Sequence, residues 1–121
     1  MVIRSGVFNL LKHERDGRTY SARQTIFERG EPGTHLFVVV EGEVEVVFEG
    51  RVLATHGPGE IFGEMAIIDA EPRSATAVAR TDCRLAAIDE KRFTYLVQSQ
   101  PFFALDLLRV MAERLRRQTT G

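Results

Sequence analysis

The alternation of apolar and polar residues divides the chain into a β-rich part and a helical part. Between residues 21 and 90, short apolar runs are separated by turns rich in Gly, Pro and acidic residues, roughly every 8–12 residues. Strands this short predict an antiparallel sandwich or barrel. The expected strands are QTIFE (24–28), HLFVVVEG (35–42), EVEVVFEG (43–50), RVLATH (51–56), EIF (60–62), SATAVAR (74–80) and CRLAAID (83–89).

Two of these strands have informative patterns. In residues 43–48, valines alternate with glutamates, as expected for a strand with one buried face. The run HLFVVV is continuously apolar, so we expect it to lie near the middle of the core. Gly42 joins the two strands and is expected to adopt a positive φ angle.

After Asp89 the apolar period changes from two residues to about 3.6, which predicts helices. A short helix over 91–98 should end before Pro101, and a longer helix is expected over 102–117. This long helix should be two-faced, with an apolar stripe that packs on the rest of the protein. The stripe contains Phe102, Leu105, Leu108, Met111 and Leu115, opposed by Asp106, Arg109, Glu113 and Arg116.

These patterns predict an α+β fold in one domain spanning residues 1–121. Residues 1–20 should form a short helix at 7–12 and a loop, residues 21–90 a β-roll, and residues 91–121 the C-terminal helices. The length of 121 residues suits a single core.

Composition narrows the class of protein. Apolar residues make up 44% of the chain and charged residues 27%, with a net charge of −1. This profile is typical of a globular protein and argues against a general nucleic-acid binder. No apolar run is long enough to span a membrane, and no signal peptide is recognisable. Cys83 is the single cysteine, which fits a cytoplasmic protein, and we expect it to be a buried structural thiol.

The stretch FGEMAIIDAEPRSATAVA, residues 62–79, contains the strongest candidate chemistry. Residues 63–68 have the composition of one or two helical turns, whose free N–H groups, cleared by Gly63, could bind an anion. Arg73 would add a planar fork suited to phosphate. Glu64 could accept a hydrogen bond from a sugar hydroxyl. The residues therefore indicate a ribose phosphate site, and the alternative is an ordinary Glu64–Arg73 ion pair at a corner of the sheet.

The same stretch closely resembles the phosphate-binding cassette of the cyclic-nucleotide-binding domain family. The matching residues are Phe62-Gly63-Glu64-Met65-Ala66 followed by Pro72-Arg73-Ser74-Ala75-Thr76, so the cassette spans residues 62–76. The resemblance also covers the glycine-containing turn at 26–33, the strand pair at 36–44 and the approach GPGEIF at 57–62. It extends over about residues 20 to 117. The family includes the sensor domains of catabolite-activator-type regulators and of cyclic-nucleotide-gated channels and kinases.

The resemblance implies an eight-stranded antiparallel β-roll with flanking helices that binds cAMP or cGMP. Arg73 would neutralise the cyclic phosphate, Glu64 would accept the ribose 2′-hydroxyl, and backbone N–H groups of Gly63, Glu64 and Ala75 would contact the phosphate or sugar. Ser74 follows the cassette arginine, and its identity favours cAMP over cGMP. The implied ligand-binding residues are Phe62, Gly63, Glu64, Met65, Ala66, Arg73, Ser74 and Ala75.

The chain departs from the family pattern outside the cassette. Arg23 stands where many members have glycine, which puts the local turn in doubt. Thr34 and His35 replace residues that are usually acidic or polar.

In the family the last helix closes over the base and in many bacterial members forms a dimer. We therefore expect ligand binding to reposition the C-terminal helix, and this helix could also form a homodimer. Residues 117–120 could reach the purine. The basic cluster of Arg114, Arg116 and Arg117 is interpreted as a favourable arrangement at a helix end.

The leading interpretation is a non-catalytic sensor module that acts on an unidentified effector and needs no cofactor or metal. One alternative is a family-like β-roll that binds no nucleotide and acts as an interaction domain. Another is a small metal-dependent β-barrel enzyme. His13, His35 and His56 are spread singly, however, and solvent-facing or capping roles are expected for them.

Overall fold

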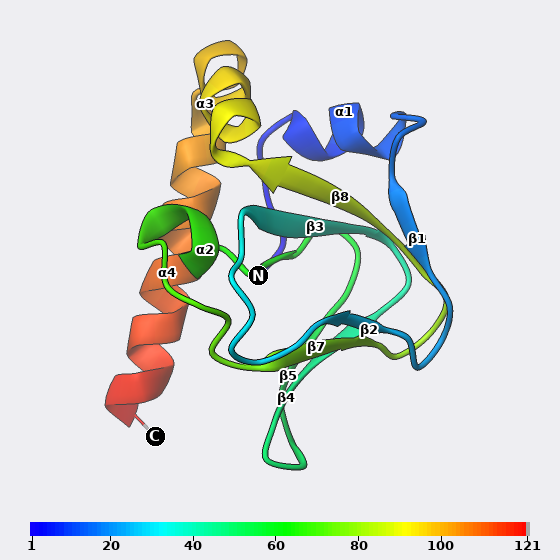
Figure 1. Ribbon diagram of the computed structural model, residues 1–121. Helices are drawn as coiled ribbons and strands as arrows, with labels where there is room; N and C mark the ends of the chain where they lie inside the picture. Colours follow the sequence, from blue (N-terminus) through cyan, green and yellow to red (C-terminus); the bar gives the residue numbers. More distant parts are fainter. Residues whose placement is uncertain (121) are drawn as a thin grey trace.

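Two four-stranded antiparallel sheets form a roll flanked by helices (Figure 1). The computed structural model describes the backbone of residues 1–120 and the side chains of residues 1–117. One sheet has the order β1-β8-β3-β6 and the other β2-β7-β4-β5. The strands are β1 (Arg18–Tyr20), β2 (Thr25–Phe27), β3 (His35–Glu41), β4 (Val44–Phe48), β5 (Arg51–His56), β6 (Ile61–Phe62), β7 (Thr76–Ala79) and β8 (Cys83–Asp89). The helices are α1 (Val7–Lys12), α2 (Met65–Ile68), α3 (Glu90–Ser99) and α4 (Phe102–Thr120).

Strand β3 separates two hydrophobic cores, which explains its continuous apolar run. Leu36, Val38 and Val40 pack with the helices on one side of their sheet. Phe37 and Val39 face the interior of the roll, where they pack with residues of the second sheet. Because both faces of β3 are covered, no polar alternation appears in its sequence. The predicted central position of this strand is therefore confirmed.

The predicted α+β roll with eight antiparallel strands is confirmed, with two local corrections. The segment 18–20 was expected to be a loop, but it forms β1 and pairs with β8. The strand expected from residue 74 begins only at Thr76. Gly42 has φ +87°, as predicted for the link between β3 and β4.

Arg23 preserves the turn that its sequence put in doubt. Its φ angle is +76°, a conformation that glycine adopts with less strain. The backbone N–H of Arg23 donates to the carbonyl of Ala79 at 2.7 Å, which ties the turn to β7. Arg23 therefore adopts a backbone conformation that glycine favours.

Helix α4 packs through a different face from the one that its apolar stripe predicts. Phe103 and Leu107 are buried, and so is Asp106, which was placed on the polar face. The Asp106 carboxylate accepts hydrogen bonds from the backbone N–H groups of Arg4 and Ser5 at 2.7 and 3.1 Å. This paired carboxylate replaces an apolar contact. The expected stripe instead faces outward, with Leu108 62% and Leu115 61% exposed.

Helix α3 agrees with its prediction, because it ends at Ser99, before Pro101. At its start, the Asp89 side chain accepts a hydrogen bond from the backbone N–H of Arg92, an N-cap.

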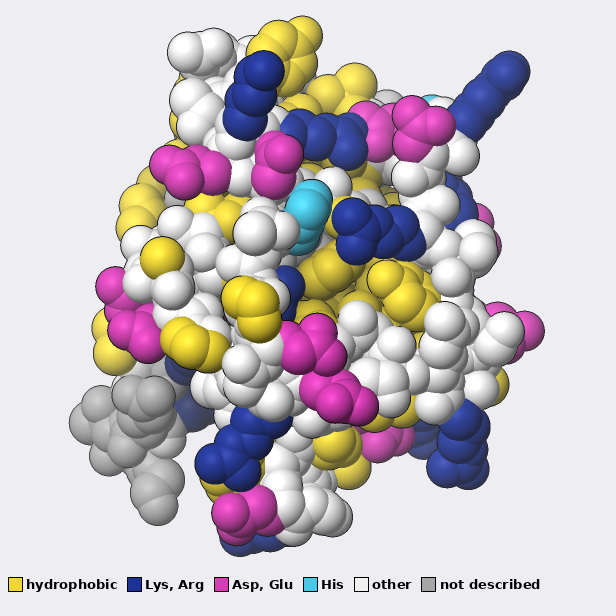
Figure 2. Space-filling view, in the orientation of Figure 1, with side chains coloured by type: hydrophobic (Ala, Val, Ile, Leu, Met, Phe, Trp, Pro, Cys, Tyr) yellow, Lys and Arg dark blue, Asp and Glu magenta, His cyan; other side chains and the backbone are white. Residues whose placement is uncertain are grey.

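The remaining expectations concern the surface and the cysteine. On the face in Figure 2, acidic and basic side chains are interspersed. Among the described residues, no helix is long and apolar enough to cross a membrane. Cys83 is buried, as predicted, and burial raises the pKa of its thiol.

Candidate functional site

The cassette crosses from one sheet to the other and lines a cavity of about 600 Å³. It starts on β6, which pairs with β3 at the edge of the first sheet, and ends where β7 begins in the second. At Gly63 the chain turns with φ +72°, and α2 follows. In Figure 1, α2 and α4 lie on the same side of the roll. The cavity volume is in the range of small-molecule sites.

Arg73 lies at one end of this cavity and is held from several directions. Its Nη1 donates to the carbonyl of Gly63 at 2.9 Å, and its Nη2 donates to the carbonyl of His35 at 2.8 Å. The guanidinium carbon lies 4.0 Å from the centre of the Phe27 ring. Burial lowers the pKa of Arg73, while Glu31 and Glu64 oppose this shift. Arginine nevertheless stays protonated at neutral pH.

Two glycines leave room for this guanidinium. A Cβ atom at Gly33 would lie 2.6 Å from Cζ of Arg73, and one at Gly63 would lie 2.8 Å from its Nη1. Both distances are shorter than real Cβ contacts, so a larger residue would displace the arginine. The buried Nε atom of Arg73 has no hydrogen-bond partner among the described residues. The hydrogen-bonding capacity of the guanidinium is therefore not fully used by the protein.

Glu64 has a fully buried side chain with 0% exposure. Its Oε1 lies 2.7 Å from Nη2 of Arg114 on α4, which forms an ion pair. Neither carboxylate oxygen has a partner with hydrogen-bond geometry within the part of the chain that the structure describes. A buried charged group of this kind is costly unless a further donor reaches it. A sugar hydroxyl is such a donor.

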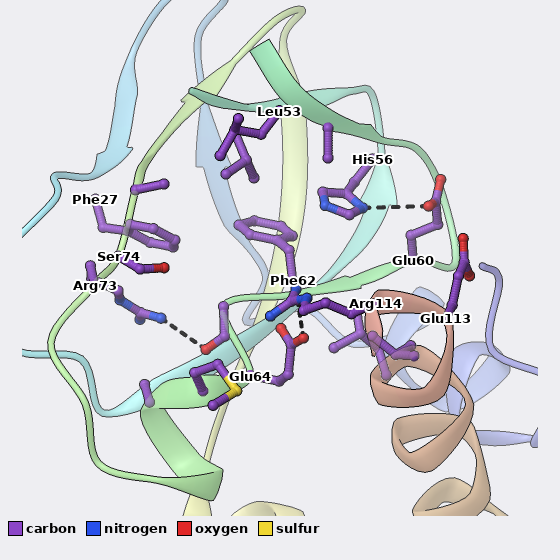
Figure 3. Close-up of a pocket in the computed structure, with 18 of the residues that line it drawn as sticks. Phe27, Leu53, His56, Glu60, Phe62, Glu64, Arg73, Ser74, Glu113 and Arg114 are labelled. Carbon is purple, nitrogen blue, oxygen red and sulfur yellow. Dashed lines mark hydrogen bonds and ion pairs between the residues drawn. The ribbon is translucent and has the colours of Figure 1, made fainter. Parts of the chain in front are cut away.

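All eight residues that the sequence singled out line the one cavity. Figure 3 shows Arg73 and Ser74 on one side, Glu64 and Phe62 in the middle, and Arg114 reaching in from α4. The alternative in which Glu64 pairs with Arg73 is not seen, because the ion-pair partner of Glu64 among the described residues is Arg114. The cavity-lining cassette residues are Phe62, Gly63, Glu64, Met65, Ala66, Arg73, Ser74 and Ala75.

Sequence reasoning missed several residues that line the cavity, among them Phe27, Glu60, Arg114 and His56. Arg114 was interpreted as a favourable charge at a helix end, but it pairs with Glu64. His56 was expected to face solvent or to cap, but it lines the cavity and its ring lies parallel to that of Phe62, with centroids 5.7 Å apart. Glu64 is the one signal from which Arg114 could have been predicted, because a carboxylate that becomes buried needs a cation as its partner. Nothing in the sequence around His56 could have indicated its position.

Residues 117–120 were considered as contacts to the purine. Arg117 lines the cavity, whereas the side chains of residues 118–120 lie outside the described residues. No group of three or more His, Cys, Asp or Glu residues that could hold a metal occurs in the described part of the chain.

The cavity thus combines a buried arginine, a buried glutamate and a turn at which glycine leaves room for the guanidinium. Comparisons with known proteins agree. Residues 17–100 match the family model described as "Cyclic nucleotide-binding domain". The chain belongs to this family.

Relatives of known function are similar over most of this chain. The Cyclic AMP receptor protein of Thermus thermophilus is 38% identical over 104 residues, which cover 82% of this chain and 48% of that protein. The CRP-like cAMP-activated global transcriptional regulator of Mycobacterium tuberculosis is 36% identical over 98 residues, covering 77% of this chain and 44% of the regulator. The chain therefore spans about half the length of these relatives.

A solved structure confirms the likeness of the fold. The crystal structure of the Thermus thermophilus Catabolite Activator Protein superposes with a TM-score of 0.80 at 35% identity. The match covers 93% of this chain and 55% of that one.

Proposed function

We propose that this chain is a non-catalytic sensor module that binds a cyclic nucleotide, cAMP in preference to cGMP. The observation that carries the proposal is the pair of buried, incompletely bonded groups in one cavity, Glu64 and Arg73. One is an acceptor suited to a ribose hydroxyl, and the other is a cation suited to a phosphate. The family of the chain supports this pairing of sugar and phosphate.

The cyclic phosphate would bind at Arg73. A guanidinium can donate two parallel hydrogen bonds to phosphate oxygens, and Nε of Arg73, which has no partner among the described residues, would form one of them once the ligand uncovers it. Because both Nη atoms now donate to backbone carbonyls, one of those bonds would be exchanged for the ligand. The N–H groups of Gly63, Glu64 and Ala75 and the hydroxyl of Ser74 would complete the contacts, as the family resemblance implies.

The preference for cAMP rests on two observations. Ser74 is the residue that follows the cassette arginine, where the family pattern associates threonine with cGMP. The relatives described above are named for cAMP. A hydroxyl contact contributes about 1 kcal/mol, so the preference from Ser74 alone is modest.

We also propose that the nucleotide repositions the C-terminal half of α4. The N-terminal half is fixed in the core by Phe103 and Leu107 and by the paired Asp106. The C-terminal half reaches the cavity through Arg114, whose side chain is 41% exposed. A ligand that changes the bonding of Glu64 therefore acts directly on this half, provided that it binds one position of the helix better than the other.

Hydrogen exchange tests the helix movement. Amide protection of residues 108–117 should change on addition of cAMP, while that of residues 102–107 should stay constant. Equal protection with and without cAMP along the whole helix would refute the movement.

The outward stripe of α4 supports a second copy of this chain as a partner. Leu108 and Leu115 are seven residues apart and both more than half exposed, and Leu105 lies one turn before Leu108. This spacing is typical of a two-helix seam. Sedimentation of the chain and of Leu108→Glu should give a dimer and a monomer. A monomer for both would contradict the dimer.

The same proposal includes a regulatory role, no catalytic activity and a cytoplasmic location. The relatives above are named as a transcriptional regulator and a receptor protein, which supports a module that passes its signal to an effector, either a partner or a further part of a longer protein. The second candidate is a roll that has the fold but binds no nucleotide.

Thermal unfolding separates the two candidates. A ligand at a hundred times its Kd stabilises the folded state by about 2.7 kcal/mol, which raises Tm by roughly 10 °C for a domain of this size. We expect this shift with cAMP and a much smaller one with 5′-AMP, whose phosphate is not cyclic. No shift with either cAMP or cGMP would favour the interaction domain.

A further inference from the structure

His56 faces the cavity from the side opposite Arg73. It ends β5, and Figure 3 shows its ring beside Phe62 and next to Glu60. The imidazole and Phe62 rings are nearly parallel, with an interplanar angle of 12°, and the His56 side chain is 15% exposed. A ligand with its phosphate at Arg73 and its sugar at Glu64 would extend its base over Phe62 towards this imidazole.

The surroundings of His56 determine which ring nitrogen carries the proton. Oε2 of Glu60 accepts a hydrogen bond from the backbone N–H of Gly57 at 2.8 Å, and its Oε1 lies 3.1 Å from the Met1 ammonium. Burial alone would raise the pKa of Glu60, but these two donors outweigh burial and lower it. The ionised carboxylate can only accept, so Nδ1 of His56, 3.4 Å from Oε1, must be the protonated nitrogen.

In the neutral ring Nε2 is therefore an acceptor. The printed contact of the imidazole with the described residues is made through Nδ1, which leaves Nε2 to face the cavity. Burial lowers the pKa of His56, although Glu60 and Glu64 oppose the shift, and the lowered pKa favours the neutral ring.

The other charged groups at this end of the cavity already have partners. Arg114 pairs with Glu64, and Arg117 pairs with Glu113 at 2.9 Å. The remaining side chains near His56 that line the cavity are mostly apolar, namely Val46, Leu53, Ala54 and Val110. Besides these apolar residues, this wall carries the hydroxyl of Thr55 and the imidazole of His56, and it is His56 whose ring lies against Phe62.

We propose that Nε2 of His56 selects the purine by its substituent at position 6, accepting a hydrogen bond from a 6-amino group and disfavouring a 6-oxo group. Adenine has a donor at this position, whereas guanine and hypoxanthine have an acceptor. The inference rests on the proposed function, since it assigns a specificity-determining residue to the same site. Two acceptors that face each other leave both unpaired, and such mismatches discriminate strongly. We expect cAMP to bind about tenfold more tightly than its 6-oxo analogue.

Acid should weaken this selection. Protonated His56 has a donor on both nitrogens, so its Nε2–H would pair with a 6-oxo group instead. The charges around the ring are the carboxylates of Glu60, Glu64 and Glu113, balanced by the Met1 ammonium and Arg114. Because the pKa of His56 is below its ordinary value of 6.5, the change should occur below pH 6.5.

The test is calorimetric titration with cAMP and with 3′,5′-cyclic inosine monophosphate, whose purine is 6-oxo and has no 2-amino group. The ratio of the two Kd values is measured at about pH 7.5 and about pH 5. Wild type should show a ratio near ten at the higher pH and a smaller ratio at the lower. His56→Leu should show a ratio near one at both, and the exposed-residue control His13→Leu should behave as wild type.

Glu60→Gln provides a second variant that keeps the imidazole. Its amide no longer requires Nδ1 to be the protonated nitrogen, so the ratio should fall at the higher pH. If cAMP and the 6-oxo analogue both bind, and their ratio is the same in wild type, His56→Leu and Glu60→Gln, the role of His56 is wrong while nucleotide binding stands. If neither nucleotide binds wild type at either pH, the proposed function itself fails.

Discussion

Removing the charge of Arg114 should destabilise the protein, because Glu64 would keep a buried carboxylate without its ion pair. Breaking a buried pair costs roughly 3–5 kcal/mol. The Glu64 side chain is 0% exposed, but that of Arg114 is 41% exposed, so solvent screens part of the interaction. For Arg114→Met, which keeps most of the side-chain length, we expect the free energy of unfolding to fall by about 2 kcal/mol.

A double-mutant cycle measured by urea unfolding isolates the pair. Glu64→Gln removes the other charge, and the double variant should lose about 1–2 kcal/mol less than the sum of the two single losses. The matched control is Arg117→Met, because the Arg117 side chain is 66% exposed and its partner Glu113 is one turn away on α4. Its loss should stay below about 0.5 kcal/mol. Additive losses at Glu64 and Arg114, with Arg114→Met no worse than the control, would refute this account of the buried carboxylate.

Two further predictions concern the cassette turn and the anchor of α4. Gly63→Ala and Gly50→Ala both place a side chain at positive φ, so each should cost about 1 kcal/mol of stability. Of the two, only Gly63→Ala should also weaken cAMP binding, because its Cβ would meet Arg73. Equal affinities of the two variants in calorimetry would contradict the tight approach at Gly63. Asp106→Ala should cost about 2 kcal/mol in urea unfolding because two backbone N–H groups lose a charged acceptor, and Asp106→Asn, which keeps one acceptor, should cost less. A loss below about 0.5 kcal/mol for Asp106→Ala would show that water replaces the carboxylate.

Much of the roll could be predicted because local signals agree with the tertiary structure. The continuous apolar run of β3 reports that both of its faces are buried, whereas the valine–glutamate alternation at 43–48 is matched only in part, because Val44 is fully buried and the rest of β4 is half-buried. Gly42 marks the turn between them through its conformational freedom. The cassette residues could be grouped in advance because they are close in sequence, and the fold gathers them around one cavity.

What could not be predicted depends on contacts between distant segments. In the sequence, Asp106 resembles a surface residue. In the fold, two N–H groups of the N-terminal segment donate to it, so α4 buries the face with Asp106 and Leu108 faces outward. Arg114 and Glu64 are 50 positions apart in the sequence. They pair because of the direction in which α4 runs past the cavity, and the local sequence does not give this direction. β1 is a three-residue edge strand whose sequence, RTY, has no period to detect.

Calorimetric titration of wild type and Arg73→Ala with cAMP tests the central claim most directly. Truncating a buried charged contact to the phosphate should cost about 3 kcal/mol of binding free energy, more than a hundredfold in Kd. Arg80→Ala serves as the control, because this exposed arginine pairs with Glu43 and Glu45 outside the cavity, and it should bind as wild type does. Binding by wild type and by Arg80→Ala, with a loss of more than a hundredfold at Arg73→Ala, is the predicted result. Equal affinity of all three proteins would contradict the assignment of the phosphate to Arg73, and no binding by wild type to cAMP or cGMP would contradict the sensor itself.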